Sequence, residues 1–277
     1  MRDNRPSLTA RVVAFGRGVG LDERRRDPLA SALLWPSAGA AFERVLASAW
    51  GGLLRATLRF ASVGLVDHAT WRMLAVDEVV QTAAPAQVVV LGAGLDTRAW
   101  RLDALRGRRV IEVDHPATQA WKRDRAASHA TVAEELVWAA ADFSRQSLDE
   151  VLAAAGHRLD APTLWIWEGV TMYLPADVTA DVLHRIARRS APGSVLVMSY
   201  AEPLPAVFSA LVSVAFRLIG EPLQGTMTSE RARRLVREAG FEVVEEHGPP
   251  SDSDARRGYL LAPAFGVERL LVALRRQ

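Results

Sequence analysis

Gln87-Val-Val-Val-Leu-Gly-Ala-Gly-Leu-Asp-Thr97 decides the fold, because it predicts an apolar strand, a glycine turn and a helix that begins near Leu95. Ile111-Glu-Val-Asp114 follows about one βαβ unit later and ends a second apolar strand. A ligand can lie against bare backbone at Gly92 and Gly94, and the unpaired N–H groups of a helix start would face it. A strand, a Gly-x-Gly turn and an acid about 20 residues later are the parts that hold a ribose-bearing cofactor.

Asp114 is the candidate ribose ligand. It stands at the tip of the apolar run Val110-Ile-Glu-Val113, beside the glycine turn, where a carboxylate can accept hydrogen bonds from both ribose hydroxyls. Glu112 is the competitor, because side chains two residues apart on a strand share a face, but the residue at the tip reaches the crevice best. The pattern therefore implies an adenosine-containing cofactor.

Thr97 bears on the choice between cofactor classes. A dinucleotide fingerprint has a third glycine at this position, where the chain has threonine. Tyr173, Tyr200 and Tyr259 also lack a lysine four residues later, so there is no Tyr-x-x-x-Lys pair. A nicotinamide-dependent oxidoreductase stays open as the alternative with less support.

Four segments together resemble the leucine carboxyl methyltransferase family and its bacterial O-methyltransferase relatives. They are Val90-Leu-Gly-Ala-Gly-Leu-Asp-Thr-Arg-Ala-Trp-Arg-Leu102, Glu112-Val-Asp-His-Pro116, Ala141-Asp-Phe143 and Glu168-Gly-Val-Thr-Met-Tyr-Leu174. The resemblance implies S-adenosyl-L-methionine as the cofactor and a seven-stranded, mostly parallel methyltransferase sheet, which is a doubly wound, Rossmann-like α/β fold.

The resemblance also implies roles for individual residues. Arg72 would clamp the methionine carboxylate, and Glu168 would bind the methionine ammonium. Asp142 would accept the adenine amino group, while the Phe143 backbone N–H addresses a ring nitrogen. With the glycine turn and Asp114, the predicted cofactor site consists of Arg72, Gly92, Gly94, Asp114, Asp142, Phe143 and Glu168.

Each of these roles has a structural alternative. Asp142 is also suited to cap a helix, and Arg72 to an ordinary surface position. Glu168 ends the apolar strand Leu164-Trp-Ile-Trp167, so it needs a partner to offset its desolvation, and an arginine would serve as well as an ammonium. Tyr173 is a candidate for lining the methyl-transfer pocket, with simple packing as its alternative; no catalytic residue is predicted.

Strands and helices alternate from Gln87 onward, which is typical of a doubly wound parallel sheet. We expect one domain over residues 1–277, with an N-terminal helical cap over 1–85 and a catalytic α/β core over 86–277. An apolar, proline-containing insertion at 202–225 follows the fifth strand and predicts a substrate lid, with a buried packing helix as the alternative. Local patterns predict a helix through 42–54 and a capping box at Ser147-x-x-Glu150.

Composition excludes several classes of function. The 277 residues include no cysteine, which removes disulfides, thiol nucleophiles and cysteine metal sites. The 34 basic and 32 acidic residues nearly balance, and their short runs are interrupted, so no nucleic-acid surface is expected. Histidines and acids do not cluster at ligand spacing, so we expect no metal. With neither a signal segment nor a membrane span expected, the sequence predicts a cytoplasmic protein.

The predicted function is an S-adenosyl-L-methionine-dependent O-methyltransferase. Its partner would be a small-molecule methyl acceptor with a carboxylate or hydroxyl group. The resemblance to the bacterial relatives implies a polyketide-like metabolite. The alternatives are the NAD(P)-dependent oxidoreductase and a methyltransferase-like module that binds cofactor without turnover. The sequence predicts neither the identity of the acceptor nor an oligomeric state.

Overall fold

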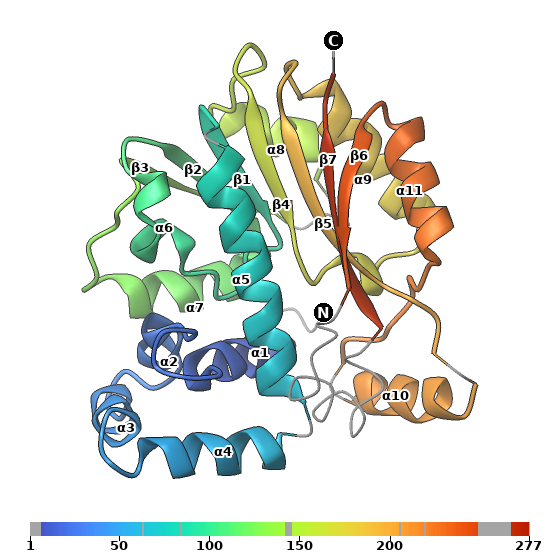
Figure 1. Ribbon diagram of the computed structural model, residues 1–277. Coiled ribbons are helices and arrows are strands. Elements are labelled where there is room, and N and C mark those ends of the chain that lie inside the picture. The colour runs from blue at the N-terminus through green and yellow to red at the C-terminus, as the bar shows by residue number, and fades with distance from the viewer. Residues whose placement is uncertain are drawn as a thin grey trace.

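A seven-stranded sheet forms the centre of the protein (Figure 1), with the strand order β3-β2-β1-β4-β5-β7-β6. The computed structural model describes residues 7–62, 64–83, 85–141, 146–204, 206–218, 220–248 and 267–276. The strands are β1 (Gln87–Leu91), β2 (Arg109–Asp114), β3 (Glu135–Ala140), β4 (Thr163–Trp167), β5 (Val195–Ala201), β6 (Glu242–His247) and β7 (Glu268–Leu274). β1 to β5 pair in parallel, and β7 runs antiparallel to both of its neighbours. The predicted fold class is confirmed.

Side chains alternate between the two faces of the sheet, as the pleat requires. Val89, Ile111 and Trp165 belong to the apolar core under α8 (Leu148–Ala154), α9 (Ala176–Arg188) and α11 (Ser229–Glu238). Val88 and Val110, their neighbours in sequence, belong to the opposite core under α5 (Leu65–Ala83) and α7 (Pro116–Ala126). Since both faces are covered by helices, the parallel strands are continuous apolar runs.

The N-terminal region is helical. It consists of α1 (Leu8–Val19), α2 (Pro28–Leu34), α3 (Gly39–Leu46), α4 (Gly51–Ala61) and the start of α5. Figure 1 shows α1 to α4 grouped beyond one end of the strands, with α10 (Ala206–Leu218) at the same end. These are the segments predicted as cap and lid, and they lie where the carboxyl ends of the parallel strands open.

The single helix predicted through 42–54 is wrong. The chain ends α3 at Leu46 and begins α4 at Gly51, with a turn between them. A Cβ on Gly51 would stand 1.8 Å from the Leu46 carbonyl oxygen, so the turn brings the backbone closer than any other residue allows. The apolar spacing continues through this break, which is why periodicity alone predicted one helix.

Two further local predictions are wrong. The helix expected near Leu95 begins only at Arg98, as α6 (Arg98–Arg101), because a turn in which the Asp96 N–H donates to the Ala93 carbonyl intervenes. Ser147 is the N-cap of α8 as expected, but its side chain makes no capping hydrogen bond. Its hydroxyl instead accepts from Arg185 of α9 at 2.9 Å, so a tertiary contact replaces the capping box.

Among the residues that the structure describes, no helix combines the length and the apolar character needed to cross a bilayer. The same residues contain no group of three or more histidines, aspartates or glutamates arranged to hold a metal ion.

Candidate cofactor and acceptor site

A cavity of about 410 Å³ opens at the carboxyl ends of the parallel strands. Its walls come from the turn after β1, the tip of β2, the loop after β4, helix α1 and the segment that follows α10. β1 and β4 are neighbours at the point where the strand order reverses, which is where open α/β sheets bind ligands. The volume is within the range of small-molecule sites.

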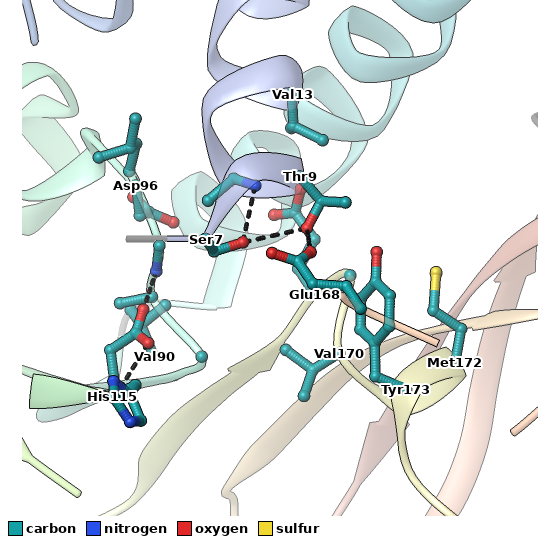
Figure 2. A pocket seen from close by; sticks show the side chains of 18 of the residues that line it. Ser7, Thr9, Val13, Val90, Asp96, His115, Glu168, Val170, Met172 and Tyr173 are labelled. Carbon is teal, nitrogen blue, oxygen red and sulfur yellow. Dashed lines mark hydrogen bonds between the residues drawn. The ribbon is translucent and has the colours of Figure 1, made fainter. Parts of the chain in front are cut away.

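Six of the predicted residues line this one cavity: Arg72, Gly92, Gly94, Asp114, Glu168 and Tyr173. They come from α5, the turn after β1, β2 and the loop after β4. Of these six, Figure 2 labels Glu168 and Tyr173. Asp142 and Phe143 lie outside the described residues, so their predicted roles at the adenine stay predictions. The fold thus brings together residues that are up to 101 positions apart in the chain, from Arg72 to Tyr173.

The glycine turn has the backbone that its residues predict. Gly92 has φ +67° and Gly94 has φ +50°, both in the left-handed region that favours glycine. A Cβ on Gly92 would come within 2.4 Å of Val170 Cγ2, and one on Gly94 within 3.2 Å of the Ala10 Cβ. The turn therefore presents bare backbone to the cavity between two close neighbours.

Asp114 is tied to that turn. One carboxylate oxygen accepts from the Gly94 N–H, and the other accepts from the His115 N–H at 2.6 Å. Burial raises the pKa of Asp114, although the two backbone hydrogen bonds oppose this. A carboxylate held against a glycine turn, with its remaining lone pairs toward the cavity, is suited to accept hydroxyl donors.

Glu112, the competitor for this role, faces elsewhere. It is fully buried and pairs with Lys122 at 2.5 Å, and it does not line the cavity. Burial raises the pKa of Glu112 to about 7, although Lys122 acts against this. Lys122, in turn, lies over the rings of Trp100 and Trp138. The pair thus belongs to the packing of α7 on the sheet.

Arg72 and Glu168 are in direct contact. The Arg72 Nε donates to Glu168 Oε1 at 2.8 Å, and its Nη1 donates to both carboxylate oxygens of Glu268 at 2.8 and 2.6 Å. Glu268 also receives His68 Nε2 at 2.6 Å. Burial favours the neutral carboxyl form, but Arg98 and Arg72 outweigh it and lower the pKa of Glu168. The surface position considered for Arg72 is wrong, since the residue is 5% exposed.

The salt bridge considered as the alternative for Glu168 is present, and it is doubled. Arg98 Nη2 lies 2.9 Å from Glu168 Oε2, opposite the contact with Arg72. Arg98 also pairs with Asp77 at 2.7 Å and with Asp96. A carboxylate has about four acceptor positions, so two guanidiniums do not exhaust Glu168.

This buried ionic network, here called the floor network, lies below the cavity. It consists of Arg72, Asp77, Asp96, Arg98, Arg101, Glu168 and Glu268, which are three arginines and four carboxylates. Asp96, Glu168 and Arg72 line the cavity. Arg98 pairs with Asp96 and Glu168, and Asp77 in turn pairs with Arg98. The excess of negative charge suits a cationic ligand, because a buried charge is stabilised by an opposite one.

Arg17 of α1 is a cavity residue that sequence reasoning missed. It is 5% exposed, and its Nη2 donates to the Leu95 carbonyl oxygen at 2.5 Å. Its Nε lies 3.8 Å from Asp27 and has no hydrogen-bond partner among the described residues. A buried guanidinium N–H without a partner, on a cavity wall, is suited to bind an anionic ligand group.

The far side of the cavity consists of hydroxyls and one acid. Thr9 donates to Glu221 Oε2, and the Leu8 N–H donates to Glu221 Oε1 at 2.9 Å. Ser7 and Thr9 share a hydrogen bond of 3.0 Å. Burial raises the pKa of Tyr173 to about 12, while a hydrogen bond with Thr9 acts to lower it. The acid comes from the segment after α10, so the predicted lid contacts the start of α1 across the cavity.

The residues that were missed carry weak sequence signals. Asp96 and Arg98 belong to the quoted motif, but nothing in their spacing distinguishes a buried pair from an exposed one. Glu268 stands at the start of an apolar strand, and Glu168 stands at the end of another. Both glutamates therefore have the same sequence signal, an acid next to an apolar run. Arg17 lies between two glycines of a helix, Gly16-Arg-Gly18, and Glu221 lies in a segment without a readable motif.

The chain is similar to known proteins of one family. The leucine carboxyl methyltransferase family matches over residues 10–187. A Streptomyces coelicolor protein named for S-adenosyl-L-methionine-dependent methyltransferase activity is 38% identical over 206 residues, which are 67% of this chain and 66% of that protein. A Frankia alni protein of the same name is 31% identical over 273 residues, 92% of this chain and 93% of that protein. For a third relative, from Streptomyces avermitilis, the match likewise spans only 66% of the relative's own length.

Solved structures agree on the fold. A crystal structure described as a methyltransferase of Thermobifida fusca has a TM-score of 0.60 and 18% identity, covering 99% of this chain and 96% of its own. A DUF574 family protein of Streptomyces avermitilis has a TM-score of 0.60 and 19% identity, covering 98% of both chains. The cofactor in the relatives' names is the one that the sequence predicted, rather than a nicotinamide. The resemblance seen in the motifs is confirmed, and the chain belongs to the leucine carboxyl methyltransferase family.

Proposed function

We propose that this protein is an S-adenosyl-L-methionine-dependent O-methyltransferase that acts on a carboxylate or hydroxyl of a small, polyketide-like metabolite. The observation that carries the proposal is the position of Asp114, which is bound to the glycine turn and faces the same cavity as Arg72 and Glu168. Family membership and the names of the relatives support the cofactor.

The residues present fit this cofactor. Asp114 would accept the ribose hydroxyls, and the bare backbone at Gly92 and Gly94 would admit the nucleoside beside it. Glu168 would bind the α-ammonium, while Arg72 would bind the α-carboxylate. The α-ammonium and the α-carboxylate are attached to the same carbon atom, so the residues that bind them have to be neighbours. Arg72 and Glu168 meet this requirement, because they are in direct contact. Asp142 and Phe143 would read the adenine.

Arg17 would add a second cation for the α-carboxylate. Arg17 lines the cavity, and its buried Nε has no hydrogen bond among the described residues, so its guanidinium has hydrogen-bonding capacity for an anionic group. Arg17 belongs to α1 and Arg72 to α5, so the carboxylate would be held from two helices. For both cations to reach the carboxylate, the cap would have to pack over the strand ends.

The chemistry requires positioning more than acid–base work. When bound, the cofactor would supply an activated methyl group on a sulfonium to an oxygen of the acceptor. The floor network and the glycine turn would hold one reactant, and the walls from α1 and the loop after β4 would hold the other. Fixing two reactants at near-attack distance contributes about 7–11 kcal/mol toward the barrier.

Calorimetric titration with S-adenosylhomocysteine and, separately, with NADH tests the cofactor class. We expect low-micromolar or tighter binding of the first and none of the second. Asp114→Ala should weaken the binding of S-adenosylhomocysteine by about 1–3 kcal/mol, because hydrogen bonds to a charged acceptor are lost. Asp103→Ala, at an acid with 85% of its side chain exposed, is the matched control and should bind like wild type. NADH binding, or an unaffected Asp114→Ala variant, would contradict the ribose assignment.

A further inference from the structure

Thr97 occupies the position where a dinucleotide fingerprint has its third glycine, and the proposed function leaves it without a role. Its side chain is buried, and it is the N-cap residue of α6 without making a capping hydrogen bond to that helix. Its hydroxyl instead donates to Asp27 Oδ2 at 2.5 Å and accepts from Arg101 Nε at 3.0 Å. The hydroxyl therefore joins the segment between β1 and α6 to the N-terminal cap.

Asp27 is the cap residue that receives this hydroxyl, and it lies between two arginines. It is fully buried and does not line the cavity. Its Oδ1 accepts from the Ala30 N–H at 3.1 Å, at the start of α2, so each carboxylate oxygen is held by one hydrogen bond. Arg17 Nε and Arg101 Nε each lie 3.8 Å from Oδ2. This distance is too long for a hydrogen bond, so the carboxylate is close to Arg17 without binding its Nε–H.

The backbone of Arg17 is fixed by the glycines on either side of it. A Cβ on Gly16 would stand 2.8 Å from the Ala69 Cβ of α5. A Cβ on Gly18 would stand 2.3 Å from Ser31 Oγ of α2. The two glycines thus let α1 pack closely against both helices (Figure 1). With its backbone held in this way, the guanidinium depends for its direction on the acceptors around it.

The guanidinium of Arg17 has one nitrogen in use and another available. Its Nη2 donates to the carbonyl oxygen of Leu95, which belongs to the same segment as Thr97. Its Nε has no hydrogen-bond partner among the described residues, although Asp27 Oδ2 is within 3.8 Å. Because the Thr97 hydroxyl draws that oxygen toward itself, the Nε–H stays available on a residue that lines the cavity.

We propose that Thr97 is a positioning residue for the cofactor: by holding the Asp27 carboxylate off Arg17, its hydroxyl keeps the Arg17 Nε–H free for the α-carboxylate of S-adenosyl-L-methionine. This inference rests on the proposed function and assigns a further residue to the same site. Thr97 does not line the cavity, so it acts through Asp27 and Arg17. A glycine at this position has no hydroxyl and would let the Asp27 carboxylate close on Arg17.

Burial makes this competition matter. Arg17 is 5% exposed, and Asp27 and Thr97 are fully buried, so solvent does not offer a replacement partner to any of them. A guanidinium and a carboxylate in such surroundings form a strong, charge-assisted pair. A direct pair between Asp27 and Arg17 would have to open before the cofactor's carboxylate could bind, and the Thr97 hydroxyl avoids that step.

Calorimetric titration of Thr97→Val with two ligands tests the inference. S-adenosylhomocysteine has the complete amino-acid tail, whereas its decarboxylated analogue lacks only the α-carboxylate. Valine has nearly the shape of threonine but no hydroxyl. We expect Thr97→Val to weaken the binding of S-adenosylhomocysteine about threefold or more, because its carboxylate loses a hydrogen bond, while the Kd for the decarboxylated analogue stays within about twofold of wild type.

Two further variants separate positioning from packing. Thr97→Ser keeps the hydroxyl and should bind S-adenosylhomocysteine like wild type. In the Arg17→Met background, Thr97→Val should have no additional effect, because the group through which it acts is gone. Thr163→Val is the matched control and should bind both ligands like wild type. Thr163 is also fully buried, and its hydroxyl accepts from Gln87 at 2.9 Å, but it begins β4 at the end away from the cavity.

A measurement on the wild-type protein does not depend on how the variants fold. The nitrogen–proton NMR resonance of Arg17 Nε can be assigned by its absence from Arg17→Met. It should shift when S-adenosylhomocysteine is added, and shift much less when the decarboxylated analogue is added.

Equal weakening of both ligands by Thr97→Val, wild-type binding of both, or a further loss in the Arg17→Met background would each overturn the inference. So would an Arg17 Nε resonance that responds to the two ligands alike. Wild-type protein that fails to bind S-adenosylhomocysteine would instead overturn the proposed function, so the two failures are distinguishable.

Discussion

Gly92→Ala should destabilise the protein by about 1.5–3.5 kcal/mol, in two separable parts. Gly92 has φ +67°, and an L-residue in the left-handed region costs roughly 1–2 kcal/mol. The new methyl would also stand 2.4 Å from Val170 Cγ2, so the valine has to leave its rotamer at roughly 0.5–1.5 kcal/mol. For a domain of this size, the sum corresponds to a fall in Tm of roughly 3–14 °C.

Gly107→Ala is the matched control for the first part. Gly107 has φ +70°, almost the same as Gly92, but a Cβ there meets nothing within 4 Å. Urea denaturation of both variants should therefore give a loss for Gly92→Ala that exceeds the loss for Gly107→Ala by about 1 kcal/mol, the rotamer cost of Val170.

A double-mutant cycle with Val170→Ala isolates the contact. In the Val170→Ala background, Gly92→Ala should cost no more than Gly107→Ala does, because the obstructing methyl is gone. Binding of S-adenosylhomocysteine should weaken in Gly92→Ala, since both residues line the cavity. Equal losses for Gly92→Ala and Gly107→Ala, or no coupling in the cycle, would refute this reading of the turn.

Two further predictions concern the charged groups. Burial acts to raise the pKa of Glu268, but Arg72 and His68 outweigh it and lower the pKa to about 2. Because this lies below the unfolded value, Glu268 should stabilise the fold by about 3 kcal/mol above pH about 4.5 and lose that contribution as the pH falls toward 2. Urea titrations across this window should show a flatter decline for Glu268→Gln than for wild type; parallel declines would contradict the assignment. Arg17→Met should weaken binding of S-adenosylhomocysteine at least fivefold by calorimetry, whereas Arg55→Met, at a buried arginine that does not line the cavity, should not. Equal effects of the two substitutions would indicate a general loss of structure instead.

The strands of the sheet could be predicted from the sequence, because strand formation depends on a local pattern of residues. Thr163 to Trp167 is a run of apolar and β-branched residues bounded by a proline and an acid, and it forms β4 with the expected bounds. The choice of Asp114 over Glu112 followed from position along the strand, and the structure places only Asp114 in the cavity. Residues at the tips of parallel strands share one edge, so their grouping could be predicted without coordinates.

The partners of those residues could not be predicted in the same way. Arg72 is 196 residues from Glu268 and 96 from Glu168, and no local pattern states which carboxylate a buried arginine meets. The break between α3 and α4 was missed for a related reason, since the apolar spacing is the same on both sides of the turn at Gly51.

By itself, then, the sequence determined the order of strands and helices, the glycine turn and the acids at the strand tips, because each depends on neighbours within a few residues. Tertiary structure alone decided that Arg17, Glu268 and Glu221 join the site, from three segments spread over 252 positions of the chain. The physical reason is that a buried charge is stabilised by whichever opposite charge or hydrogen-bond donor the fold brings within about 3 Å, and this depends on packing between distant elements.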